Sequence, residues 1–420
     1  MLGVPPAIYD RSMPYDVARI RRQFPALSRR QHGRHVAWLD GPAGTQVPSS
    51  VIEATTTLLR GGVSNHGGDF APSRQAEALT DAARSAVADL FNASPNEIVF
   101  GQNMTSLTFA TSRAIARDWR PGDRIIVTTL DHDANVTPWS EAARDAGAEV
   151  ISIEFDPATG LLDPDAVIDA LDERTRLVAI TAASNALGSV TDLAPIIAAA
   201  RQVGALSFVD AVHFSAHRLS NVALLQPDFL VASAYKFFGP HTGILYGRRE
   251  HLESLAPYKV RPAPDSAPDR WETGTQSFES LVAVTAAVEH LASLGQGASR
   301  RSRLESAFAA IRTHEEGLGS RFLSGIAEMP SIRLFGPSEV GEQRVSTFAV
   351  EVEGISPQTV AAEMGRRGIY LWVGHYYAIG VMEQLGLMDS GGLVRIGFVH
   401  YSTTSEVDRV LEALEFLGSS

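Results

Sequence analysis

Lys236 stands out chemically, because it is one of only two lysines among the 36 lysines and arginines of this 420-residue chain. An arginine stays protonated and forms no imine, whereas a lysine amine can lose its proton and attack a carbonyl carbon. Lys236 ends the apolar run 229–235, which is typical of a buried strand, and Gly239-Pro240 follows. The sequence therefore favours a nucleophilic amine at the edge of a sheet over a solvated surface lysine. The other lysine, Lys259, has no such setting.

Asp210 is the candidate acidic partner for a site that contains the Lys236 amine. It ends the apolar run 206–209, where burying an unpaired carboxylate would be costly. The carboxyl ends of parallel strands open onto one crevice, so Asp210 and Lys236 would face the same space. In enzymes that use pyridoxal phosphate, a lysine binds the cofactor as a Schiff base and a carboxylate keeps the pyridine nitrogen protonated. The alternative for Asp210 is a helix cap or a turn.

A phosphate group would need backbone N–H groups at the start of a helix. Phe100-Gly101 is typical of a strand end, and Thr105 and Ser106 follow at a predicted helix start. Both hydroxyls could cap that helix and donate to phosphate oxygens. Such caps are common and do not by themselves indicate a phosphate site. The position of the motif supports that interpretation, because the first helix of the sheet domain is expected to begin there.

His132 follows the predicted strand 124–129, where its ring could stack on a planar cofactor. The alternative is a metal site with Asp131 and Asp133, but adjacent residues in a turn rarely converge on one ion. Asn185 follows another predicted strand and could bond the cofactor's phenolic oxygen or the substrate.

His213 and His217 have the i, i+4 spacing of a zinc pair on a helix. No glutamate follows His213 in the metalloprotease pattern, and both residues lie just after Asp210. We therefore expect His213 in the pocket, His217 in a structural role and no metal site.

Composition limits the possible functions. A net charge of −12 is the opposite of the basic face of a nucleic-acid-binding protein. The chain has no cysteine, which rules out disulfides, thiolate metal sites and a cysteine nucleophile. No apolar run approaches the ~20 residues of a membrane span, and the N-terminus lacks a signal-peptide pattern. We expect a cytoplasmic enzyme with a small-molecule substrate and neither nucleic-acid nor membrane partners.

Hydrophobic patterning predicts the elements that must position these residues. Between about residues 36 and 260, short apolar runs alternate with helical stretches, which indicates a mainly parallel sheet covered on both faces. The predicted strands are 124–129, 150–153, 177–181, 206–210, 229–232 and 242–246, and the predicted helices are 138–147, 163–171 and 192–203.

A chain of 420 residues is longer than a single hydrophobic core usually accommodates, so we expect two domains. Residues 1–35 are predicted to form an N-terminal arm on the small domain, with a helix at 16–23. Residues 36–275 form the predicted large domain, and 276–420 a smaller C-terminal α+β domain with linking helices. The elements predicted for this last part are helices 276–294, 301–322, 357–367 and 403–417, the last with a capping box at Thr403 and Glu406, and strands 345–352, 369–373 and 393–397.

The set of residues resembles the class V aminotransferase family, fold type I pyridoxal-phosphate enzymes that include cysteine desulfurases, kynureninases and isopenicillin-N-epimerase-like proteins. The similarity covers about residues 36–415 and is greatest to the cysteine-desulfurase-like subgroup. Its carriers are Trp38-Leu-Asp40-Gly-Pro-Ala43-Gly44, Thr105-Ser106, Asp131-His132, Ser184-Asn185-x-x-Gly188, Phe208-Val-Asp210-Ala-Val-His213 and Ser233-Ala-Tyr-Lys236-x-x-Gly239-Pro240. The resemblance implies an α/β fold with a large, mainly parallel sheet of the seven-stranded type and a smaller C-terminal domain.

The resemblance also implies a role for each matching residue. Lys236 would form the Schiff base with pyridoxal 5'-phosphate, Asp210 would pair with the pyridinium nitrogen, and His132 would stack on the ring. Arg395 would clamp the substrate α-carboxylate in a bidentate contact. The other implied ligands are Thr105, Ser106 and Ser233 for the phosphate, His213 in place of a frequent glutamine, and Thr275, which would reach the phosphate of the neighbouring subunit in a homodimer.

One departure from the family pattern restricts the reaction. Desulfurases take sulfur onto a mobile cysteine, but the corresponding stretch here is Trp372-Val-Gly-His375-Tyr376-Tyr377-Ala378 and the chain has no cysteine. Persulfide formation on the protein is therefore excluded, and we expect His375 and Tyr377 to contact a bulkier or differently polarised substrate. The leading hypothesis is Cα deprotonation by Lys236 and β-elimination from a cysteine-like or S-conjugated amino acid. The alternatives are transamination, epimerisation at Cα and a non-catalytic binding module.

Overall fold

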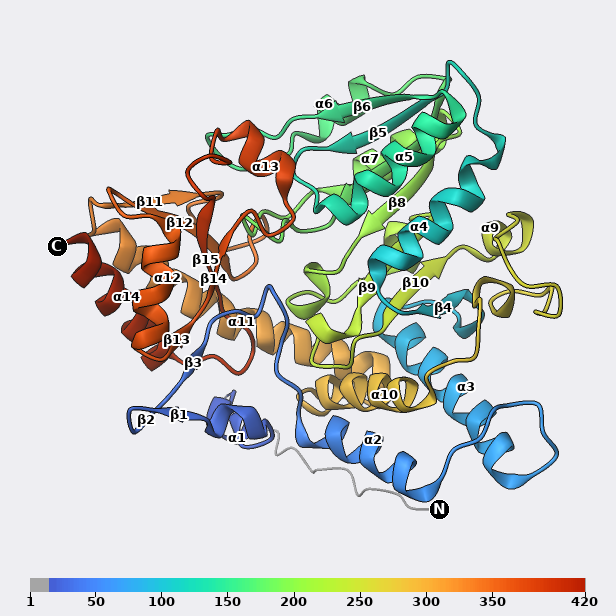
Figure 1. The fold of residues 1–420 in the computed structure, drawn as a ribbon, viewed down its shortest axis with the longest axis horizontal. Coiled ribbons are helices and arrows are strands. Elements are labelled where there is room, and N and C mark those ends of the chain that lie inside the picture. Colours follow the sequence, from blue (N-terminus) through green and yellow to red (C-terminus); the bar gives the residue numbers. More distant parts are fainter. Residues whose placement is uncertain (1–14, 420) are drawn as a thin grey trace.

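The computed structural model describes residues 15–419, and its largest element is a seven-stranded sheet (Figure 1). The strand order is β4-β10-β9-β8-β7-β5-β6. Neighbours among β5 to β9 are parallel, whereas β10 is antiparallel to β4 and β9. The predicted mainly parallel sheet is confirmed. Its strands are β4 (Ile98–Gly101), β5 (Arg124–Thr128), β6 (Glu149–Ile153), β7 (Thr175–Thr181), β8 (Leu206–Asp210), β9 (Phe229–Ser233) and β10 (Gly243–Gly247).

Alternate residues of these strands pack into two separate cores. Ile126 and Val178 belong to one core, and Ile125 and Leu177 belong to the other. Because helices cover both faces, the strands are apolar throughout, and this explains the continuous apolar runs of the sequence. The helices over the first face are α3 (Ala71–Phe91), α7 (Leu193–Gln202) and α10 (Phe278–Ser293), and those over the second are α4 (Met104–Ile115) and α5 (Thr137–Ala146).

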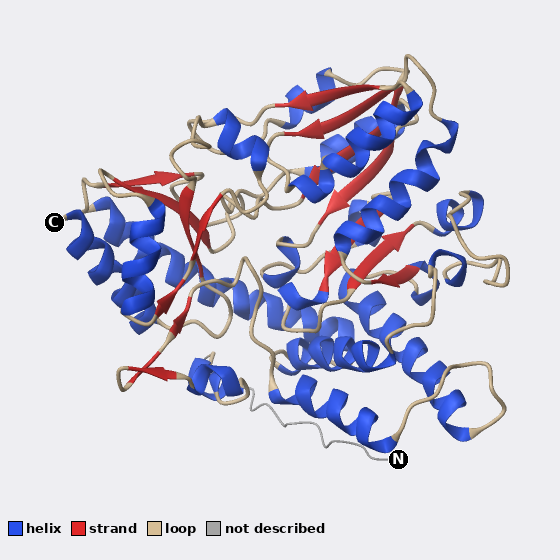
Figure 2. Ribbon diagram, viewed as in Figure 1, coloured by secondary structure: helices blue, strands red, loops and turns tan. Residues whose placement is uncertain are grey.

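A four-stranded antiparallel sheet forms a second, smaller layer beside the first (Figure 2). Its order is β11-β12-β15-β14, and its core includes Phe322, Val360 and Val407 from three covering helices. The predicted capping box is confirmed, because Thr403 and Glu406 bond each other's backbone at the last helix. These elements are β11 (Ile332–Phe335), β12 (Thr347–Val352), β14 (Trp372–Gly374), β15 (Leu393–Gly397), α11 (Arg300–Ala327), α12 (Pro357–Arg366) and α14 (Thr404–Gly418).

The prediction of one continuous strand at residues 369–373 was wrong, because the structure has two short strands there. β13 (Ile369–Tyr370) pairs in parallel with β3 (Ala37–Trp38), whereas β14 pairs with β15. Leu371 separates the two pairings. The five residues are all apolar or aromatic, so the pattern alone does not reveal that the run changes partners.

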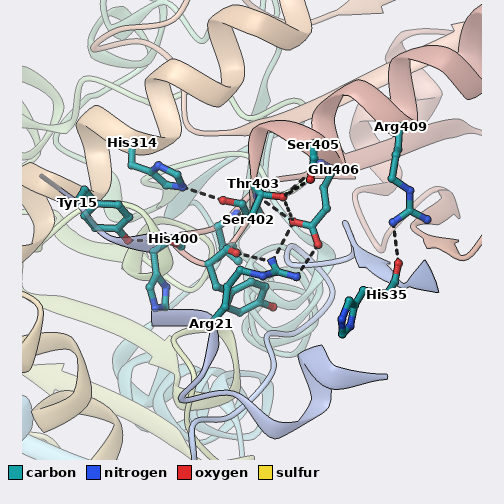
Figure 3. Close-up of polar contacts among 12 residues, drawn as sticks. Tyr15, Arg21, His35, His314, His400, Ser402, Thr403, Ser405, Glu406 and Arg409 are labelled. Carbon is teal, nitrogen blue, oxygen red and sulfur yellow. Dashed lines mark hydrogen bonds and ion pairs between the residues drawn. The ribbon is translucent and has the colours of Figure 1, made fainter. Parts of the chain in front are cut away.

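The N-terminal segment contacts the last helix and the loop before it (Figure 3). The Arg21 guanidinium donates to both carboxylate oxygens of Glu406 at 3.0 Å and to the Tyr401 carbonyl at 2.7 Å. The Tyr15 hydroxyl donates to the His400 carbonyl at 2.9 Å. The remaining elements are α1 (Val17–Arg21), β1 (Arg30–Gln31), β2 (Arg34–His35), α2 (Ser49–Gly61), α6 (Pro164–Asp169), α8 (Val222–Leu225), α9 (Arg249–Ser254) and α13 (Ile379–Gln384).

Two features link the layers. Helix α11 contributes Ile311 to the core of the large sheet and Phe322 to the core of the smaller one. Ala37 and Leu39, from the N-terminal part of the chain, also belong to the core of the smaller sheet. The division of the chain at residues 35/36 and 275/276 stays a prediction. Within residues 15–419, no helix is long and apolar enough to cross a membrane.

Candidate active site

A cavity of about 1080 Å³ opens where the carboxyl ends of β5, β7, β8 and β9 face the smaller sheet. It is lined by every predicted site residue except Thr275, which is exposed and outside it. The predicted residues in the lining are Thr105, Ser106, His132, Asn185, Asp210, His213, Ser233, Lys236, His375, Tyr377 and Arg395.

Lys236 follows β9, and its side chain points into this cavity. Its amine donates to the Pro42 carbonyl and lies 4.9 Å from the centre of the Tyr235 ring. Burial, together with the charge of Arg395, lowers the pKa of Lys236 to about 7. A large fraction of these amines is therefore unprotonated at neutral pH, as a nucleophile or base requires.

Asp210 ends β8 and exposes 4% of its surface. Its Oδ1 accepts a hydrogen bond from the Val212 N–H at 2.8 Å. Burial raises the pKa of Asp210 to about 6, although the Val212 N–H and Lys236 oppose the rise. A carboxylate with so few donors is suited to a cationic partner such as a protonated ring nitrogen.

Asp131, whose carboxyl group interacts electrostatically with Asp210, lies in a buried network of hydrogen bonds. Asp131 accepts hydrogen bonds from the Thr128 hydroxyl at 2.5 Å and from Asn135 Nδ2 at 2.7 Å. Burial raises the pKa of Asp131 to about 8, and the charge of Asp210 adds to the rise. Both carboxylate oxygens of Asp131 are thus engaged by protein donors. No cluster of three possible metal ligands occurs in the described part of the chain.

His132 is held as a neutral ring. Its Nδ1 accepts from the Ala134 N–H at 3.0 Å. Burial, with contributions from Lys236 and Arg395, lowers the pKa of His132 to about 4. The ring stacks on Tyr377 with centroids 5.6 Å apart and 23° between the planes.

At the predicted phosphate end of the cavity, the residue that caps helix α4 differs from the one expected from the sequence. Asn103, rather than Thr105 or Ser106, caps α4, and its Oδ1 accepts from the Ser106 N–H at 2.9 Å. The Ser106 hydroxyl donates back to the Asn103 carbonyl at 2.9 Å. Ser233 lies beside this helix start, because its Oγ accepts from the Met104 N–H at 3.1 Å. The first turn of α4 nevertheless faces the cavity, as the phosphate assignment needs.

Arg395, on β15 of the smaller sheet, is a buried cation in the lining of the cavity, with 4% of its surface exposed. It donates to the Asn185 carbonyl at 2.9 Å, and its guanidinium lies 4.2 Å from the Tyr376 ring centre. Burial lowers the pKa of Arg395 to about 10, which still leaves it charged at neutral pH. Asn185 Nδ2 donates to the Tyr376 carbonyl at 3.0 Å.

The two histidines after β8 have separate protein partners. His213 Nε2 lies 2.9 Å from the Thr347 hydroxyl, and His217 Nδ1 lies 2.7 Å from Glu315 Oε2. Burial, with the neighbouring His217, lowers the pKa of His213 well below its ordinary value. His213 is a neutral lining residue of the cavity, and the two histidines contact different side chains.

Sequence reasoning missed Tyr235 and His241, which both line the cavity. Their rings stack 4.6 Å apart with 11° between the planes. Their closeness to Lys236 in the sequence was the only available signal. The turn 239–240 that brings His241 back over Tyr235 depends on the tertiary fold.

Comparison with known proteins agrees with this geometry. The family model for class V aminotransferases matches residues 37–410. The chain belongs to the class V aminotransferase family. It is 31% identical to a cysteine desulfurase of Pectobacterium carotovorum subsp. carotovorum (96% of this chain, 98% of that protein) and 32% identical to the aminotransferase-like protein FGM3 of Gibberella zeae (97% and 99%). It is similar in structure to a cysteine desulfurase from Thermococcus onnurineus NA1, with a TM-score of 0.87 and 26% identity over 97% of this chain and 99% of that one.

This class V aminotransferase is a pyridoxal-phosphate-dependent enzyme, as its family is. The residues of the cavity fit the cofactor and an amino-acid substrate. Asn185 Oδ1 and Arg395 Nε are buried polar atoms without a hydrogen-bond partner among the described residues. Such atoms are rare unless a ligand or water satisfies them. Together with the amine of Lys236 and the carboxylate of Asp210, they leave bonding capacity within one cavity.

Proposed function

We propose that this class V aminotransferase is a C–S lyase. In this proposal it removes the Cα proton of an amino acid and eliminates a sulfur leaving group from Cβ of a cysteine-like or S-conjugated substrate. The observation that carries the proposal is the presence, in one cavity, of an amine with a pKa of about 7 and the buried cation Arg395. The absence of cysteine from the chain removes the persulfide alternative.

Several side chains are proposed to hold the cofactor. Lys236 holds its aldehyde end, Asp210 faces its ring nitrogen and His132 covers its ring. Thr105, Ser106 and Ser233 hold its phosphate at the start of α4, and Asn185 and His213 complete the lining. When bound, pyridoxal phosphate supplies an electron sink for the bonds at the substrate Cα.

Arg395 is proposed to orient the substrate. A guanidinium binds a carboxylate through two parallel N–H···O bonds, and Arg395 keeps its Nε free of protein partners in the described chain. Because its Nη1 already donates to the Asn185 carbonyl at 2.9 Å, the guanidinium plane is fixed before the substrate arrives. Fixing the α-carboxylate at this end directs the rest of the amino acid toward Lys236.

Lys236 Nζ is proposed to be the base after the substrate amine has taken its place at the aldehyde end of the cofactor, which would free the lysine amine. It accepts the Cα proton as the substrate sulfur leaves Cβ with the bonding electrons, and the ammonium so formed returns the proton to the departing thiolate. Hydrolysis of the remaining enamine consumes one water, so an S-substituted cysteine yields a thiol, pyruvate and ammonia. No protein thiol takes part, which is consistent with the sequence.

The sulfur part of the proposal draws on relatives named cysteine desulfurases. The relative named aminotransferase-like protein FGM3 supports transamination as the second candidate. Epimerisation at Cα needs the same base. A non-catalytic module has less support, because Lys236, Asp210 and Arg395 are all present in one cavity.

Product analysis separates these candidates. We expect the purified enzyme, given S-substituted cysteines, to release thiol, pyruvate and ammonia in equal amounts, and the Lys236→Ala variant to release none. Formation of pyridoxamine phosphate with a stoichiometric keto acid that retains the side chain would instead establish the aminotransferase.

We further propose a cytoplasmic homodimer in which Thr275 reaches the phosphate end of the neighbouring site. Its exposure, outside the cavity of its own chain, is compatible with that role.

A further inference from the structure

The stretch 372–378 forms an aromatic wall of the cavity. Tyr377 exposes 66% of its surface and Trp372 exposes 54%, and both line the cavity. Trp372 lies opposite Arg395 in the β14–β15 ladder, so the two side chains project from the same face of the sheet. At the other end the Tyr377 ring stacks on His132. The wall thus extends from the proposed carboxylate clamp to the histidine proposed to cover the cofactor.

This wall is fixed by bonds to the rest of the cavity. The Asp133 N–H donates to the Tyr377 carbonyl at 2.7 Å, and Asn185 Nδ2 donates to the Tyr376 carbonyl at 3.0 Å. The Tyr376 hydroxyl donates to the Leu393 carbonyl. Because the backbone is anchored at two successive carbonyls, the exposed rings are already positioned, and binding against them costs little ordering entropy.

The charges around the wall restrict what it can face. Among the described residues that line the cavity, the only lysine or arginine side chains are Lys236 and Arg395, and both are committed to the cofactor and the α-carboxylate. His375 Nδ1 accepts from the Tyr377 N–H at 3.0 Å, so that nitrogen is already engaged by the wall itself. Asp133, which also lines the cavity, adds a negative charge. An acidic side chain would therefore find no further lysine or arginine there.

We propose that the substrate side chain carries a planar ring without negative charge, which stacks on Tyr377. Large exposed aromatic side chains at the mouth of a concave site mark ligand contacts, and ring–ring contacts favour flat groups over flexible chains of similar size. This inference rests on the proposed function, because it names the substrate class of the same site.

Binding to the holoenzyme at pH 8 tests the inference without requiring elimination. The apparent dissociation constants of L-alanine, L-norleucine, L-phenylalanine, L-tryptophan and L-glutamate would be measured from the change in cofactor absorbance. We expect phenylalanine and tryptophan to bind at least about fivefold tighter than norleucine and alanine, and glutamate to bind most weakly.

Substitutions then assign the preference to the wall. Tyr377→Ala should remove the advantage of phenylalanine over norleucine, and Tyr377→Phe should keep that advantage. Tyr258→Ala is the matched control, because Tyr258 is 64% exposed and lies outside the cavity. Should Tyr377→Ala fail to fold, Trp372→Ala serves as the second variant and should reduce the same ratio.

Three results would overturn the inference: no preference for phenylalanine over norleucine, an unchanged preference in the alanine variants of the wall, or glutamate binding as tight as phenylalanine. If alanine binds normally, these results leave the proposed function standing. If no amino acid changes the cofactor absorbance, both the inference and the proposed function fail.

Discussion

At the scale of single residues, Asp210 is proposed to act through its charge rather than its shape. In Asp210→Asn the amide oxygen can still accept from the Val212 N–H, which Asp210 Oδ1 bonds at 2.8 Å, but the negative charge is lost. We expect kcat to fall by about 100-fold or more while the protein still binds the cofactor. Steady-state kinetics and the cofactor absorbance measure the two effects separately. A variant with near-normal turnover would show that the acid has another role.

Lys236 should titrate near neutrality in the cofactor-free protein. Because burial and Arg395 lower its pKa from 10.5 to about 7, the reactive neutral amine is scarce below pH 6 and dominant above pH 8. We expect its labelling by an amine-selective reagent to rise with pH through a midpoint near 7, and Arg395→Gln to move that midpoint upward. Lys259, whose ammonium is engaged by Asp265 at 2.9 Å, is the internal comparison. Mass spectrometry of two peptides follows both, and a midpoint above pH 9 for Lys236 would contradict the geometry.

Arg395 should affect substrate more than cofactor. Arg395→Gln removes the charge that is proposed to bind the α-carboxylate, and losing a buried charged hydrogen bond costs about 3 kcal/mol, on the order of 100-fold in KM. Cofactor affinity should change little. Arg333→Gln, on strand β11 of the same sheet but outside the cavity, is the control. An equal loss of cofactor binding would count against the carboxylate role.

At the scale of elements, the start of α4 depends on Asn103. Its side chain accepts from the Ser106 N–H, and its loss should cost about 1 kcal/mol of stability. We expect Asn103→Ala to lower the unfolding midpoint of the cofactor-free protein and to weaken cofactor binding, and Asn103→Ser, which can still cap, to restore both. Differential scanning calorimetry and a cofactor titration measure these effects. An unchanged midpoint in the alanine variant would mean that the cap contributes nothing.

The same elements explain how far the sequence could be used for prediction. Lys236, Asp210 and Arg395 could be found because a charged residue at the end of, or within, an apolar run is costly unless it is functional. The cap at Asn103 could not be distinguished from Thr105 or Ser106, since all three types cap helices. The change of strand partner at Leu371 depends on contacts with segments far away in the sequence. The stacking of His241 on Tyr235 depends on a turn that folds the chain back on itself. Local sequence patterns encode neither feature.

At the scale of the whole molecule, the proposed homodimer makes a prediction about subunit mixing. If Thr275 acts in the neighbouring site, a mixed dimer of Lys236→Ala and Thr275→Ala chains has one doubly damaged site and one intact site. We expect mixing the two impaired variants under subunit exchange to restore activity, up to about a quarter of wild type for random exchange. Mixing Lys236→Ala with Asp210→Asn is the control, because both residues line the cavity of their own chain and every site keeps one lesion. If the first mixture stays as inactive as the control although the Thr275→Ala variant is itself impaired, Thr275 serves its own chain and the proposed arrangement of the dimer is wrong.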